Sequence, residues 1–175
     1  ATHHAHHAEL EERGIGDIWT MTVDEYHQSS WWMRLVYRFF RNPFFLFLIA
    51  PTINFVILNR LTIGAPDTWR HGEKASVWWT NFVLLGLFAA ASALIGFTNM
   101  ILIELPIIVI ASSVGTYLFY AQHQFERTYW EHTPHWNYTL AAMQGSSYYK
   151  LPPILQWFTG NIGFHHIHHL SPRIP

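Results

Sequence analysis

Two histidine clusters with the same spacing lie near the two ends of the chain. One is in THHAHHAEL, residues 2–10, and the other is in GFHHIHHL, residues 163–170. Both contain the pattern His-x-x-His-His, and the two triplets are His3, His6 and His7, and His165, His168 and His169. Positions i, i+3 and i+4 share one face of a helix, so each triplet can present three imidazoles to one point. Imidazole binds Zn, Cu, Fe and Ni, so the spacing predicts metal binding.

The number of histidines indicates what kind of metal site they form. An expression tag is the alternative for the first cluster, but alanine interrupts it and the same spacing recurs internally. The chain contains no cysteine, so a metal must be bound by histidines, carboxylates or amides. Six histidines exceed the roughly four ligands of a tetrahedral zinc. They suit two redox metals with open positions, a site that favours oxygen activation.

The composition predicts a lipid-facing protein of one domain. Of 175 residues, 50% are hydrophobic, 17% aromatic and only 12% charged, whereas a typical soluble domain has about 25% charged residues. The net charge of -1 provides no overall basic field for nucleic acid. The many aromatic residues suit the aromatic belts that form at membrane–water interfaces.

Two apolar runs are long enough to cross a bilayer. They cover residues 77–97 and 100–121 and have 21 and 22 residues, against about 20 needed for a spanning helix. We predict a transmembrane hairpin over 77–121 that turns at 98–99. A third run, 44–58, is shorter and is interrupted by Pro51, so we predict a re-entrant or interfacial segment over 44–62.

The positive charges predict the topology. All ten Lys and Arg residues lie outside residues 75–126, so the positive-inside rule places both flanks of the hairpin in the cytoplasm. An even number of crossings then brings both histidine clusters to one face. The predicted fold is all-α: an integral membrane helical bundle with a cytoplasmic helical cap that carries the histidine clusters.

Two further segments have recognisable patterns. In WWMRLVYRFFRN, residues 31–42, three arginines are spaced by four and three residues, opposite aromatic side chains. This predicts a basic amphipathic helix at the membrane surface, with an ordinary surface helix as the alternative. Residues 151–158 predict a short interfacial helix that starts at the prolines. The glycine-rich turn at 159–164 leads the second triplet into a helix start or a loop.

Several longer stretches resemble one known family. They are THHAHHA, RGIGDIWTMTVDEY (13–26), QHQFERTYW (122–130) and GSSYYKLPPILQWFTGNIGFHHIHHLSPRIP (145–175). Together they resemble the membrane fatty acid desaturases, within the superfamily of non-haem di-iron desaturases and hydroxylases. The resemblance covers essentially the whole chain and is closest to bacterial acyl-lipid desaturases of the delta-12 (omega-6) type.

The resemblance implies a reaction and its partners. Two irons, bound almost entirely by histidines, would use O2 and two electrons to introduce a cis double bond into an acyl chain. The substrate would be an acyl-lipid or another acyl carrier. The electron donor would be of the ferredoxin or cytochrome b5 type, and the location a bacterial inner membrane with the histidines on its cytoplasmic face.

The resemblance also implies roles for individual residues. The two triplets correspond to the second and third histidine boxes of the family, and His123 in QHQ is a further candidate ligand. The alternative for His123 is a histidine that only supports a ligand or lies in the interface. Glu126 and Asn161 are candidates to orient a ligating imidazole. Asn161 would alternatively bind iron through water, and Glu126 would alternatively be a solvated loop carboxylate.

The first histidine box of the family has no counterpart in this chain. We therefore interpret the chain as a fragment whose site lacks about two ligands and which is inactive alone. The predicted division is 1–43 (second box and interfacial helix), 44–62 (re-entrant or interfacial segment), 77–121 (hairpin) and 122–175 (cytoplasmic segment with the third box).

Other functions are compatible with parts of the pattern. An acyl hydroxylase, alkane monooxygenase or carotenoid hydroxylase of the same superfamily would carry the same boxes. A membrane zinc hydrolase would need a carboxylate beside the metal, as in His-Glu-x-x-His, and neither cluster has one. A non-catalytic membrane protein that binds or transports metal is the remaining alternative.

Overall fold

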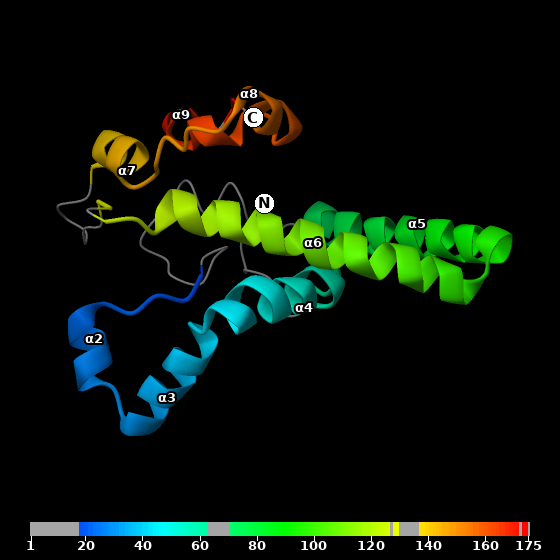
Figure 1. The fold of residues 1–175 in the computed structure, drawn as a ribbon, viewed down its shortest axis with the longest axis horizontal. Coiled ribbons are helices and arrows are strands. Elements are labelled where there is room, and N and C mark those ends of the chain that lie inside the picture. Colours follow the sequence, from blue (N-terminus) through cyan, green and yellow to red (C-terminus); the bar gives the residue numbers. More distant parts are fainter. Residues whose placement is uncertain (1–17, 63–70, 127, 130–136, 172, 175) are drawn as a thin grey trace. The chain divides into compact units, whose positions relative to one another are not determined.

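The computed structural model describes residues 18–62, 71–126, 128–129, 137–171 and 173–174, and every regular element in that part is a helix (Figure 1). This confirms the predicted all-α class. The chain divides into two compact units: Ala1–Met21 with Tyr117–Pro175, and Thr22–Thr116. We call the first the histidine unit and the second the apolar unit.

The apolar unit begins with two short helices that have side-chain caps. At the start of α2 (Val23–Gln28), the Thr22 hydroxyl accepts from the Glu25 amide at 3.2 Å, and the Glu25 carboxylate accepts from the Thr22 amide at 2.7 Å. This reciprocal capping box satisfies two amides that the helix itself leaves unpaired. The Ser30 hydroxyl caps α3 (Trp31–Phe40) in the same way, accepting from the Met33 amide. A helix is thus confirmed where the sequence predicted the basic amphipathic one.

The shorter apolar run forms an irregular helical segment. It consists of the π-helix η1 (Phe45–Ile49), α4 (Ala50–Val56) and the 3-10 helix η2 (Leu58–Arg60). Pro51 has no amide hydrogen to continue the regular hydrogen-bond pattern, which accounts for the wider π turn just before it. The segment from Phe45 to Arg60 is bent by 59° from α3. Such a bent pair is either one broken span or a re-entrant loop, so the re-entrant segment over 44–62 stays a prediction.

Two helices are long and apolar enough to cross a membrane. They are α5 (His71–Ile95) and α6 (Phe97–His123), in which the qualifying stretches are Gly72–Ile95 and Phe97–His123, of 24 and 27 residues. Pro106 lies inside α6 without ending it. The helices agree in position with the two predicted spans.

The break between α5 and α6 falls at Gly96, not at 98–99 as the sequence suggested. Gly96 has φ +88°, a left-handed backbone that glycine adopts without a side-chain clash. The Asn99 side chain donates to the Ile95 carbonyl at 2.7 Å, which satisfies an acceptor at the end of α5. The Phe88 and Phe97 rings meet edge to face at 6.1 Å next to this break. The glycine, and not the polar pair after it, therefore ends the helix.

In the part of the histidine unit that the structure describes, the last turns of α6 are followed by four short helices. These are α7 (Tyr138–Gln144), α8 (Pro153–Phe158), the 3-10 helix η3 (Ile162–Phe164) and α9 (His165–Leu170). α8 begins at the prolines, as predicted. The glycine-rich turn before α9 is confirmed as well, since Gly160 and Asn161 both have left-handed backbones, with φ of 61° and 64°. The second histidine triplet therefore lies on a helix and not on a loop.

Candidate metal centre

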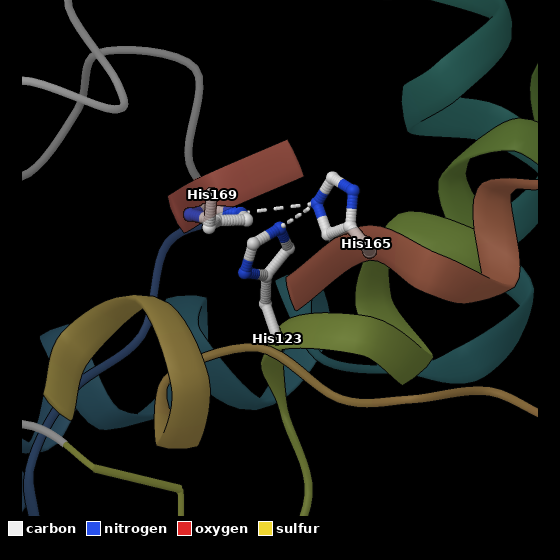
Figure 2. A group of neighbouring side chains, drawn as sticks. All are labelled: His123, His165 and His169. Atoms are coloured by element: carbon white, nitrogen blue, oxygen red, sulfur yellow. Dashed lines mark hydrogen bonds between the residues drawn. The ribbon is translucent and has the colours of Figure 1, made fainter. Parts of the chain in front are cut away.

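Three histidines from two helices meet at one point in the histidine unit. His165 and His169 lie one turn apart on α9, and His123 comes from the last turn of α6 (Figure 2). The His165 Nε2 atom lies 2.9 Å from His123 Nε2 and 3.1 Å from His169 Nε2. One ligand atom from each of the three lies within 4.8 Å of the other two. The i, i+4 spacing read from the sequence thus places two imidazoles on one face, and α6 supplies a third.

The geometry of these nitrogens fits a bound cation. A neutral imidazole has one N–H donor and one acceptor nitrogen, so His165 Nε2 can satisfy only one of its two short contacts as an ordinary hydrogen bond. A metal about 2.1 Å from each nitrogen would hold neighbouring ligands roughly 3 Å apart, close to the distances observed. The two short separations at His165 Nε2 are therefore compatible with nitrogens that bind one transition metal.

The surroundings keep this cluster partly away from solvent. His169 is only 4% exposed, and His123 and His165 are half-buried. The Phe119 ring lies 4.5 Å from the His123 ring. The Tyr138 hydroxyl donates to the His169 carbonyl at 2.9 Å, and it also contacts the Leu170 carbonyl at 3.1 Å. The end of α9 that carries His169 is thereby tied to α7.

His168, the third member of the triplet, is oriented differently. Its ring stacks on that of His165, with the centroids 5.7 Å apart. Its Nδ1 atom hydrogen bonds to the Ile174 carbonyl. A carbonyl only accepts, so this contact places the proton on Nδ1 and leaves Nε2 with the lone pair that a metal would use. His168 is not one of the three whose ligand atoms meet, but its tautomer suits a ligand.

The other predicted site residues that the structure describes are not part of the cluster of His123, His165 and His169. The first triplet, His3, His6 and His7, lies outside the described residues. Glu126 is exposed in the turn after α6, and Asn161 is exposed in the turn before α9, where it has a left-handed backbone. His166, at the variable position of the second cluster, lies against the Tyr148 ring at 5.9 Å. Among the described residues, the group that could hold a metal ion consists of His123, His165 and His169, and the wider predicted set stays a prediction.

Two residues near the cluster escaped the sequence analysis. Gln122 is 0% exposed, and its Nε2 atom donates to the Ile162 carbonyl at 2.5 Å, just before α9. Tyr149 hydrogen bonds through its side chain to Tyr117 of α6, and this contact, with burial, raises the pKa of Tyr149 above its usual value. The signal for Gln122 was present in QHQ, where a polar residue directly precedes the candidate ligand at the end of an apolar helix.

Comparisons with known proteins identify the family of the chain. The family model described as "Fatty acid desaturase" matches residues 1–175. A protein of Bacillus subtilis (strain 168) named "Fatty acid desaturase" is 45% identical over 173 residues, which cover 99% of this chain and 48% of that protein. The chain thus spans about half the length of this curated relative. No solved structure matches. The sequence, the helical architecture and these matches together show that the chain belongs to the fatty acid desaturase family.

Proposed function

We propose that this chain is part of an oxygen-dependent di-iron desaturase that introduces a cis double bond into an acyl chain. The observation that carries the proposal is the meeting of three imidazole nitrogens at the end of a membrane-length helix in a member of this family. The acyl-lipid substrate and the delta-12 (omega-6) position follow only from the sequence resemblance. An acyl carrier other than a lipid remains within the proposal.

The proposed iron ligands come from both histidine clusters and from α6. They are His3, His6, His7, His123, His165, His168 and His169. When bound, the two irons would supply the redox chemistry by which O2 and two electrons remove two hydrogens from adjacent methylenes. The electron donor would be of the ferredoxin or cytochrome b5 type.

The protein's own contribution in this proposal is to fix ligands and to exclude water. The Ile174 carbonyl holds His168 in the tautomer with Nε2 open. The burial of His169 shields one side of the cluster from solvent. Glu126 and Asn161 remain candidates to orient an imidazole, and both would need to turn inward from the exposed positions they have here.

The proposed location is an inner membrane with the histidines on its cytoplasmic face. α5 and α6 provide two crossings by length and composition. α3 would lie in the interface, because Arg34, Arg38 and Arg41 share one face and exposed aromatic side chains cover another. Acidic lipid headgroups would attract that basic face.

Product analysis of the full-length enzyme tests the reaction. Expression in a host that lacks the corresponding desaturase should yield a new cis-monoene or diene in its lipids, seen by gas chromatography and mass spectrometry. The purified protein should contain about two irons. A product that is hydroxylated but has no new double bond would show that the enzyme is a hydroxylase of the same superfamily and not a desaturase. One tightly bound zinc, with no iron under reducing conditions, would exclude the di-iron reading.

Cysteine labelling tests the topology, and the absence of native cysteine from this chain makes the labels unambiguous in it. Cysteines at Thr98 or Asn99, next to the break between α5 and α6, should react from the side opposite to cysteines at Ser30 and Lys150. Labelling of all these positions from one side would contradict the hairpin.

A further inference from the structure

We infer that Gln122 is a positioning residue that sets the distance between His123 on α6 and His165 on α9. It is neither one of the proposed ligands nor part of the histidine pattern. The inference rests on the proposed metal centre at these histidines.

Gln122 is attached at both its side chain and its backbone. The side chain reaches out of the last turn of α6, and Nε2 donates to the Ile162 carbonyl at 2.5 Å. The Gln122 carbonyl accepts from the Ser147 amide at 2.9 Å. The residue is completely buried. The Oε1 atom of this buried amide has no hydrogen-bond partner among the described residues, so the bond from Nε2 is the one that offsets the cost of burial. Losing that bond would leave the whole amide unsatisfied, and it therefore favours one arrangement of the two segments that it joins.

The segment that receives Gln122 leads directly into the metal cluster. Ile162 is the first residue of η3 and lies three residues before His165. η3 is followed without a break by α9, so a shift of Ile162 is transmitted to His165. His123 is the residue next to Gln122 on α6. One hydrogen bond therefore connects the residue directly before His123 to a residue three positions before His165, and these two proposed ligands belong to different helices.

A second contact fixes the same turn from another side. The Tyr149 amide donates to the Gly163 carbonyl at 2.9 Å. A Cβ atom at residue 163 would lie 2.2 Å from the Tyr149 carbonyl oxygen and 2.8 Å from Gln156 Oε1. The backbones are thus too close for any side chain, and only glycine fits. The turn before α9 is held between the end of α6 and the segment 147–149.

The test compares two glutamines two residues apart in the full-length protein. Gln122→Met keeps the length of the side chain and removes the donor. The matched control is Gln124→Met, because Gln124 Nε2 also donates a hydrogen bond, at 2.6 Å, but to the exposed Thr20 hydroxyl. Apo-protein is titrated with Co²⁺, and the ligand-field absorption reports affinity and coordination without any need for activity.

Gln122→Met should weaken Co²⁺ binding by about ten-fold or more and change the absorption bands, as loss of outer support for metal ligands does. Gln124→Met should retain the wild-type spectrum and affinity. An unchanged spectrum, with affinity within about two-fold for Gln122→Met, would overturn the inference and leave the metal centre standing. Wild-type protein that binds neither Co²⁺ nor iron would overturn both this inference and the proposed metal centre.

A second variant covers the case in which Gln122→Met does not fold. Gly163→Ala disturbs the same turn without touching α6 and should produce the same spectral change. If both variants fold, their effects on Co²⁺ affinity should be clearly less than additive, because they act on one turn. Full additivity, or a wild-type spectrum for a folded Gly163→Ala protein, would contradict the inference.

Discussion

The neighbourhood of α9 in the histidine unit and the long helix α5 of the apolar unit differ in which side chains they bury, although both units expose large hydrophobic side chains, among them Trp157 of α8 at 75%. In the histidine unit the most buried side chains include polar ones, with Gln122 at 0% and His169 at 4% exposure. In the apolar unit large hydrophobic side chains point outward, and Leu85 of α5 is 68% exposed. Buried polar groups are tolerated where they are hydrogen bonded, as at Gln122 and His169, whereas large exposed apolar patches are unfavourable in water.

This difference indicates that the long apolar helices and the neighbourhood of α9 suit different surroundings. The outward apolar side chains of α5 and α6 suit a lipid environment, in which a helix that is apolar on all sides is stable. The buried polar groups near α9 are used to hold backbone carbonyls and to bring imidazoles together. Substitutions of the same type should therefore have very different effects in the two units.

The largest effect is expected at the buried histidine. His169→Ala removes one of the three converging nitrogens, and it should reduce iron content by at least half and activity of the full-length enzyme on the order of 100-fold or more. Iron is measured by mass spectrometry and activity by product formation. His166→Ala, on the same helix but facing Tyr148, is the control. Full iron content in His169→Ala would show that the cluster of His123, His165 and His169 is not part of the iron site.

A charge in the middle of α5 should have the next largest effect. Leu85→Arg places a guanidinium near the centre of the Gly72–Ile95 stretch and should make membrane insertion less favourable by about 3 kcal/mol. The measurement is the inserted fraction in a translocation assay.

The control for this substitution lies in the other unit. Met143 of α7 is 46% exposed, and Met143→Arg should change stability by less than about 0.5 kcal/mol, as exposed substitutions usually do. If Met143→Arg reduced the inserted fraction as much as Leu85→Arg does, the assignment of different environments to the two units would be contradicted.

The basic face of α3 should contribute a smaller, lipid-dependent effect. Replacing Arg34 and Arg38 by Gln should weaken the preference for vesicles with anionic over neutral lipid by about 2 kcal/mol, or roughly thirty-fold, at about 1 kcal/mol per charge. Replacement of both by Lys keeps the charge and should preserve most of the preference. The measurement uses full-length protein and a depth-sensitive spin label at Leu35, in bilayers with and without phosphatidylglycerol. A label depth independent of anionic lipid in all variants would count against an interfacial α3.

The smallest effect is expected at Tyr138. Tyr138→Phe removes the hydroxyl that contacts the carbonyls at the end of α9 and should cost about 1 kcal/mol of stability. It should lower metal affinity only a few-fold, since His169 itself remains. Tyr148→Phe is the control, because Tyr148 is 54% exposed and contacts its neighbours through its ring. A thermal unfolding midpoint that is the same for both variants would show that the Tyr138 contact does not stabilise α9.

Local pattern was sufficient to predict α3, α5, α6 and α8, and to predict that two of the histidines share a helix face. Unbroken apolar length predicted α5 and α6, the arginine spacing predicted α3, and the prolines predicted the start of α8. The i, i+4 spacing of His165 and His169 predicted that they share a face. These features depend on residues close together in the chain, for which helical periodicity is enough.

Long-range contacts could not be read from the same patterns. His123 was singled out as a further candidate ligand only through the family resemblance, and it is the packing of α9 near the end of α6 that brings its Nε2 atom to 2.9 Å from His165 Nε2. The end of α5 at Gly96 was misplaced, because the polar residues at 98–99 were given more weight than the freedom of glycine to adopt positive φ. The sequence marks Gln122 only as a polar residue at the end of an apolar helix, and its partner could not be predicted because Ile162 lies forty residues away.

The sequence by itself thus determined that this protein has membrane-length helices and histidines spaced to bind metal. The tertiary structure decided which of the described histidines meet, and that a buried glutamine and a glycine without room for a side chain hold them there. The physical reason is that spacing along one helix fixes a shared face, whereas the distance between two helices depends on contacts between residues far apart in the chain.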